Sequence, residues 1–148
     1  MVLDAQTQTL LQEIFHRESR SLLQYLQESF PWTTAENQAA VVQLKKMSAE
    51  EREGAARVAR FLRRHQIDLP YLGSFPMEFT TINFIGLDYA APLLVKSERA
   101  AVADLERDLS RITDSEARSL VQGILTVKQR HLKDLETLAA AVPATTLR

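Results

Sequence analysis

Helical periodicity is the feature of this sequence that most limits its fold. Four long segments carry apolar residues at alternating spacings of three and four positions, which places those residues on one face of an α-helix. No segment alternates apolar and polar residues for long with the period of a β-strand. The 148 residues include only four glycines and five prolines, as expected for long elements with few interruptions. The sequence therefore predicts an all-α fold.

The lengths of the connections predict how the four helices are joined. Short turns separate the first helix from the second and the third from the fourth, whereas a long aromatic-rich crossover, residues 66–83, joins the second to the third. This pattern predicts two antiparallel hairpins joined by a crossover, an up-down four-helix bundle formed by one domain over residues 1–148. The helices are expected at residues 4–29, 34–65, 87–112 and 117–142, with a turn at 30–33 and a frayed tail at 143–148.

The helix boundaries leave three points open. Asp4 and Thr34 are expected N-caps, and either Thr113 or Asp114 caps the last helix. Ser48 and Glu51 also form a capping-box pattern that would start a new helix inside the second segment. In the third segment, Pro92 either opens the helix proper or kinks it.

Composition excludes several classes of protein. The formal net charge of −1 gives no overall field that would recruit nucleic acid or an anionic membrane. No signal-peptide pattern begins the chain, and no apolar run approaches the roughly 18 residues of a membrane span. A cytoplasmic protein is expected. The chain has no cysteine, which excludes disulfides, thiolate metal sites and thiol catalysis.

Charged residues interrupt the apolar face of every predicted helix near its middle. In the last helix Lys128 and His131 hold two places of the apolar stripe, and Glu18, Glu51 and Glu98 hold corresponding places in the other three. Burying such groups costs several kcal/mol unless partners compensate. Glu18 and Glu51 are 33 residues apart, as are Glu98 and His131, so antiparallel hairpins would bring them to similar heights. We expect one polar layer inside the bundle.

These residues resemble the ferritin-like superfamily, the bacterioferritins and rubrerythrins. In that family a carboxylate-bridged di-iron site uses Glu from the first and third helices and Glu-x-x-His from the second and fourth. Glu18 followed by Tyr25, the run EEREGA that contains Glu51, and the run KSERAAV that contains Glu98 are similar to the first three helices. The run KQRHL, which contains His131, is similar to the fourth. The resemblance implies a ferritin-like fold and marks Glu18, Glu51, Glu98 and His131 as candidate metal ligands.

The chain departs from the family pattern at two ligand positions. Gly54 stands where the second helix would supply histidine, and Lys128 stands where the fourth helix would supply a bridging glutamate. Three ionised glutamates and one protonated lysine sum to about −2, which would balance one divalent ion at most.

Several interpretations of the layer follow. The leading one has no cofactor: the Lys128 ammonium replaces the metal, and the protein is a noncatalytic module with a degenerate di-iron site. The alternative is a metal-dependent oxidoreductase or iron-handling protein with one iron, manganese or zinc ion on Glu51, Glu98, His131 and perhaps Glu18. A third interpretation makes Lys128 a general base or Schiff-base former, although adjacent carboxylates favour its charged form.

The remaining motifs concern partners. The arginines at positions 57, 60, 63 and 64 are placed favourably for a helix C-terminus, and no nucleic-acid motif surrounds them, so no nucleic-acid partner is expected. His16 and His65 lack ligand-spaced neighbours and are expected at the surface or the rim. Aromatic residues Tyr71, Phe75, Phe79 and Phe84 either cover their own bundle or form a homodimer interface.

Overall fold

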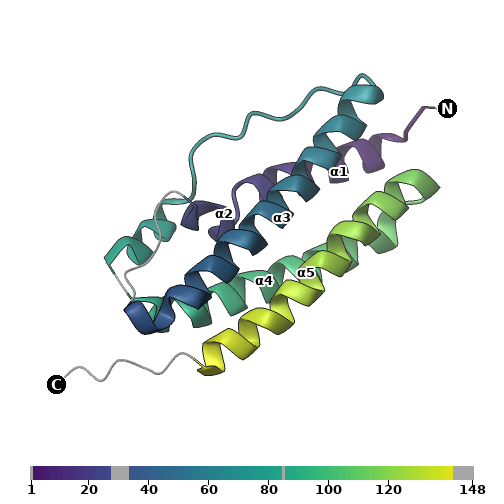
Figure 1. The fold of residues 1–148 in the computed structure, drawn as a ribbon. Helices are drawn as coiled ribbons and strands as arrows, with labels where there is room; N and C mark the ends of the chain where they lie inside the picture. Colours follow the sequence, from purple (N-terminus) through teal and green to yellow (C-terminus); the bar gives the residue numbers. More distant parts are fainter. Residues whose placement is uncertain (1, 28–33, 85, 142–148) are drawn as a thin grey trace.

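The computed structural model describes residues 2–27, 34–84 and 86–141, with residues 82 and 84 described by their backbone alone, and this part of the chain is helical without a β-strand. The all-α prediction is confirmed. The helices form one elongated bundle (Figure 1). In chain order they are α1 (Ala5–Ser19), α2 (Leu22–Leu26), the 3-10 helix η1 (Ala35–Asn37), α3 (Gln38–Arg64), the 3-10 helix η2 (Met77–Phe84), α4 (Leu87–Arg111) and α5 (Ser115–Ala141).

The first predicted helix is interrupted, and the prediction of one continuous helix was wrong. Asp4 caps α1 as expected, because its Oδ1 accepts a hydrogen bond from the Thr7 amide at 2.8 Å. At Ser21 the backbone is extended (φ −72°, ψ 161°), and its Oγ accepts from the Gln24 amide at 3.2 Å. A serine in this conformation starts a helix, so α2 begins anew after Arg20. The expected turn at 30–33 lies outside the described residues.

The second predicted helix is confirmed in its length and its buried face. After η1, α3 runs without a break to Arg64, and every residue of the predicted seam is buried. The capping-box pattern at Ser48 therefore does not start a new helix. The buried residues before and after Ser48 lie on one stripe of α3. Because a break would turn one part of this stripe toward solvent, the continuous helix is favoured. The buried seam consists of Val41, Leu44, Ser48, Glu51, Ala55, Val58 and Leu62.

The crossover returns the chain to the end of the bundle where α3 began (Figure 1). Gln66 leaves α3 with a positive φ of 59°, and the chain then runs back along the bundle as far as η2. Because of this return, α4 runs in the same direction as α3. Pro92 lies inside α4, after five other helical residues, so it does not open the helix. Asp114 caps α5, since its Oδ2 accepts from the Ala117 amide at 2.9 Å.

Each long helix has two antiparallel neighbours. α1 packs on α3 and α4, and α5 packs on the same two helices (Figure 1). The buried apolar residues form two separate clusters. One cluster includes Leu11, Val58, Leu105 and Val121, and the other includes Leu26, Leu44, Leu94 and Leu135. In the sequences of α3, α4 and α5, the predicted charged layer falls between the contributions of each helix to the two clusters, and Glu18 falls between the contributions of α1 and α2.

The crossover aromatics divide into covered and exposed residues. Phe75 and Phe79 lie against Tyr25, with ring centroids 5.4 and 5.9 Å from its ring. Tyr71 and Met77 are 92% and 84% exposed. The first pair packs along its own bundle, whereas the second pair leaves apolar surface in solvent. The side chain of Phe84, Val142 and the predicted tail lie outside the described residues. Across the described residues, the helices are too short or too polar to cross a membrane.

Candidate functional site

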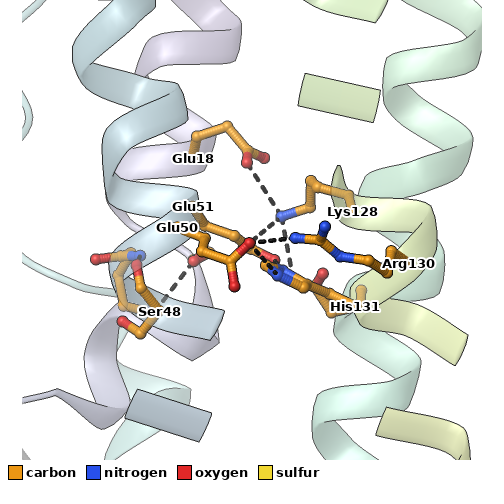
Figure 2. A network of polar contacts seen from close by, with 10 residues as sticks. Glu18, Ser48, Glu50, Glu51, Lys128, Arg130 and His131 are labelled. Atoms are coloured by element: carbon orange, nitrogen blue, oxygen red, sulfur yellow. Dashed lines mark hydrogen bonds and ion pairs between the residues drawn. The ribbon is translucent and has the colours of Figure 1, made fainter. Parts of the chain in front are cut away.

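The predicted polar layer is present in the structure. Glu18 comes from α1, Glu51 from α3, Glu98 from α4, and Lys128 and His131 from α5, and each of the five is at most 3% exposed. In Figure 2 the side chains of Glu18, Glu51 and His131 converge near the Lys128 ammonium. Their burial follows from the helical stripe: each occupies a place whose neighbours one turn away are in the core.

Lys128 is the centre of this layer. Its Nζ donates to Glu18 Oε1 at 3.1 Å and to Glu51 Oε1 at 2.9 Å, and it lies 3.1 Å from Glu98 Oε1. An ammonium has three donor hydrogens, so three carboxyl groups can satisfy it completely. Burial alone would lower the pKa of Lys128, but the three glutamates outweigh that effect and raise it well above its usual value. Lys128 is therefore an ammonium, which argues against a general base or a Schiff-base nucleophile.

The glutamates differ in protonation although they share one cation. Burial acts to raise the pKa of Glu51, but the Lys128 charge and hydrogen bonds from His131 and Glu98 lower it to about 2. For Glu98, burial and the nearby Glu51 charge raise the pKa to about 9. Burial also raises the pKa of Glu18, with Lys128 opposing. At neutral pH Glu51 is a carboxylate and Glu98 carries a proton.

His131 links the layer to the outside of the bundle. Its Nδ1 lies 2.7 Å from Glu51 Oε2. Because an ionised carboxylate can only accept, Nδ1–H is the donor, and the neutral ring then carries its lone pair on Nε2. That nitrogen is buried without a hydrogen-bond partner and lies 3.7 Å from Glu50 Oε2. Glu50 in turn is paired with Arg130 (Figure 2).

Gly54 contributes no side chain to the layer and packs close to Ile124 of α5. A Cβ added at Gly54 would lie 3.5 Å from Ile124 Cγ1, an ordinary van der Waals contact. The position therefore accepts the Cβ of alanine without a clash, and Ile124 is the side chain that a larger residue at this position would adjoin.

The layer fits a metal ion by donor chemistry but not by charge. Glu51, Glu98 and His131 each offer one donor atom, and those atoms lie within 4.8 Å of one another. Two carboxylates and one imidazole suit iron, manganese or zinc. However, the Lys128 ammonium already contacts the Glu51 and Glu98 oxygens, and a second cation beside it would be repelled strongly in a low-dielectric interior. With Lys128 in this position, the residues do not fit an ion.

Two polar features near the layer were missed by the sequence reasoning. Asp108 is buried and its Oδ2 accepts from Arg17 Nη2 at 2.6 Å. The predicted apolar seam of this helix has a gap between Leu105 and Ile112. Helical spacing places position 108 in that gap, so the sequence could have indicated that Asp108 is buried. The pairing of Glu50 with Arg130 at the edge of the layer had no such signal, because both residues lie beside, rather than on, the apolar stripe.

The other histidines and arginines remain outside the layer. His16 is exposed, with its Nε2 3.0 Å from the Leu72 carbonyl oxygen, and His65 stacks on Phe61 with ring centroids 4.5 Å apart. Arg60 pairs with Glu53, and Arg64 pairs with Glu116. Arg60 and Arg64 therefore take part in ordinary surface ion pairs.

Comparison of the chain with models of known protein families, with curated proteins and with solved structures found no match. Over its described residues the protein is a helical bundle with a buried ammonium–carboxylate centre.

Proposed function

We propose that this protein is a ferritin-like module that works without a metal, in which the Lys128 ammonium takes the place of the metal centre. One observation carries the proposal: a fully buried Nζ lies 2.9–3.1 Å from carboxyl oxygens of three different helices. The antiparallel neighbours of each long helix and the long crossover support the ferritin-like part. The module is proposed to bind a protein or small-molecule partner through its surface, with the charged layer holding the scaffold in shape.

The test follows the Lys128 ammonium directly. Protein labelled with nitrogen-15 at lysine is expected to show one ammonium signal protected from solvent exchange, and Lys128→Arg identifies it by its loss. Adding ferrous, manganous or zinc ions should leave this signal unchanged, and ferrous ion in air should oxidise no faster than in buffer. An ion that displaces the Lys128 signal would contradict the metal-free proposal.

An altered mononuclear centre is the second candidate, with an oxidoreductase or iron-handling role. The specific observation in its favour is that donor atoms of Glu51, Glu98 and His131 already lie within 4.8 Å of one another. It requires Lys128 to leave the layer. Stoichiometric metal that is lost in Glu98→Gln, together with iron-dependent oxygen consumption, would establish it.

We also propose that the crossover forms a homodimer interface. Tyr71 and Met77 are both strongly exposed, and aromatic and methionine side chains are enriched where proteins meet. Light scattering on the eluting protein should give twice the chain mass, and Tyr71→Ser with Met77→Ser should give the chain mass. A monomer of the unchanged protein at micromolar concentration would contradict this proposal.

A further inference from the structure

A hollow of about 360 Å³ lies beside the charged layer, between α3 and α5. Its lining includes Glu50 from α3 and Arg130, His131 and Asp134 from α5. Figure 2 shows the His131 ring reaching from the layer toward Glu50 and Arg130. The hollow is distinct from the Lys128 contacts, because it adjoins the opposite side of the imidazole.

His131 is held as metal-binding histidines are held. Such histidines usually donate one ring N–H to a carboxylate, which fixes the ring and makes the other nitrogen more basic. Here Nδ1–H donates to the Glu51 carboxylate at 2.7 Å, and Glu51 is kept ionised by Lys128. The other nitrogen, Nε2, is buried without a hydrogen-bond partner, and His131 is among the residues that line the hollow. A ring nitrogen held in this way is a candidate metal ligand.

Two carboxylates are placed to complete a coordination set with Nε2. Glu50 Oε2 lies 3.7 Å from it. Two ligands of one tetrahedral zinc ion, each about 2.1 Å from the metal, lie roughly 3.4 Å apart, so a shift of a few tenths of an ångström suffices. Asp134 follows His131 by three positions, which puts both on the same face of α5, and it lines the same hollow.

Arg130 forms an ion pair with Glu50. Its side chain is 56% exposed, and exposed ion pairs contribute little to stability. Arg130 can therefore turn into solvent when a cation binds. The remaining positive charges at the rim, Arg130 and Lys46, oppose the ion, so micromolar rather than nanomolar affinity is expected.

We propose that His131 Nε2, Glu50 and Asp134 bind one zinc-like divalent transition ion in this hollow, with water completing the shell. One imidazole and two carboxylates form a donor set that zinc accepts. The site lies outside the Lys128 layer and does not require the ammonium to move.

The experiment measures binding of Zn²⁺ and Co²⁺ to the full chain by calorimetry after removal of metals. One ion per chain is expected, with cobalt absorbance typical of four or five ligands. Asp134→Asn and Glu50→Gln should each weaken binding at least tenfold while leaving the helical circular dichroism unchanged. Glu136→Gln, on the same helix but outside the hollow, is the matched control and should bind like the unchanged protein.

Nitrogen-15 spectra of labelled histidine provide an independent readout. The Nε2 resonance of His131 should shift on binding zinc, while the Lys128 ammonium signal stays in place. Absence of binding up to millimolar ion, or binding that Asp134→Asn and Glu50→Gln leave unchanged, would overturn the proposal. Displacement of Lys128 would instead place the ion in the layer and overturn both this proposal and the metal-free function, whereas absence of binding overturns this one alone.

Discussion

The charged layer and the two apolar clusters on either side of it are equally buried but stabilise the bundle by different rules. Lys128 is 1% exposed, and Leu11 and Leu44 are 0% exposed. Each leucine contributes through the area it removes from water, largely independently of residues elsewhere. Each member of the layer depends on its partners, because a buried charge that loses its counter-charge is expensive. The difference shows that burial alone does not determine what a position tolerates.

Removing the ammonium should have the largest effect on stability. Lys128→Met leaves Glu51 without its counter-charge and is expected to cost about 3–5 kcal/mol in urea unfolding. Adding Glu18→Gln and Glu51→Gln should restore much of that loss, since no charge then remains unpaired. Leu11→Ala and Leu94→Ala, which lie in different clusters, should instead lose stability additively. Additive losses within the layer would contradict the comparison.

Installing a metal centre should require a change in the layer and another in the apolar cluster beside it. Lys128→Glu supplies a carboxylate, and Gly54→His supplies an imidazole, whose Cβ would lie 3.5 Å from Ile124 Cγ1. We expect the triple variant with Ile124→Ala to bind ferrous ion, measured by elemental analysis after gel filtration. The variant that retains Ile124 is the control and should bind less. Equal iron in both would show that the imidazole fits beside Ile124 without repacking.

Glu98 should make the contribution of the layer to stability depend on pH, whereas the contribution of the apolar clusters should not. Its pKa is about 9 in the folded protein and near 4.5 when unfolded, so the folded state holds more protons between these values. Stability contributed by protonated Glu98 is therefore complete below pH 4.5 and is lost as pH rises toward 9, by at most about 1.4 kcal/mol per pH unit. Glu98→Gln, which resembles the protonated acid, should flatten that slope. Urea unfolding at pH 6 and pH 9 measures it.

The smallest expected effect is a gain in stability when Gly54 is replaced by alanine. Alanine is favoured over glycine inside a helix by roughly 0.5–1 kcal/mol, and the added methyl group would make only ordinary contact with Ile124. Gly123→Ala is the matched control, because a Cβ there meets nothing within 4 Å. Thermal unfolding should show similar gains for both. A loss of stability in Gly54→Ala alone would mean that the packing beside the layer cannot accommodate even one added carbon atom.

Sequence periodicity predicted the layer because burial repeats with the helix, and a charge in a buried stripe is visible as an exception. Glu51 and Lys128 were found in this way. The break at Ser21 was not, since a serine caps a helix only when the backbone around it turns, which depends on tertiary packing. The proton on Glu98 depends on distances to Glu51 and Lys128 that no sequence spacing gives. The contact of His131 with Glu50 joins a buried residue to a half-exposed one, and periodicity does not report on the half-exposed side.

The three contacts of Lys128 also determine how the helices can be aligned along the bundle axis. The apolar clusters would tolerate a helix that slides by one turn, about 5.4 Å, because one leucine can replace another. The layer would not, because such a slide would leave an ammonium facing hydrocarbon. We infer that Lys128 selects a single alignment among many that the leucines alone would permit. The test uses the triple variant Lys128→Met with Glu18→Gln and Glu51→Gln. Doubled amide resonances would show that its helices adopt more than one alignment, and one sharp set of resonances would refute the inference.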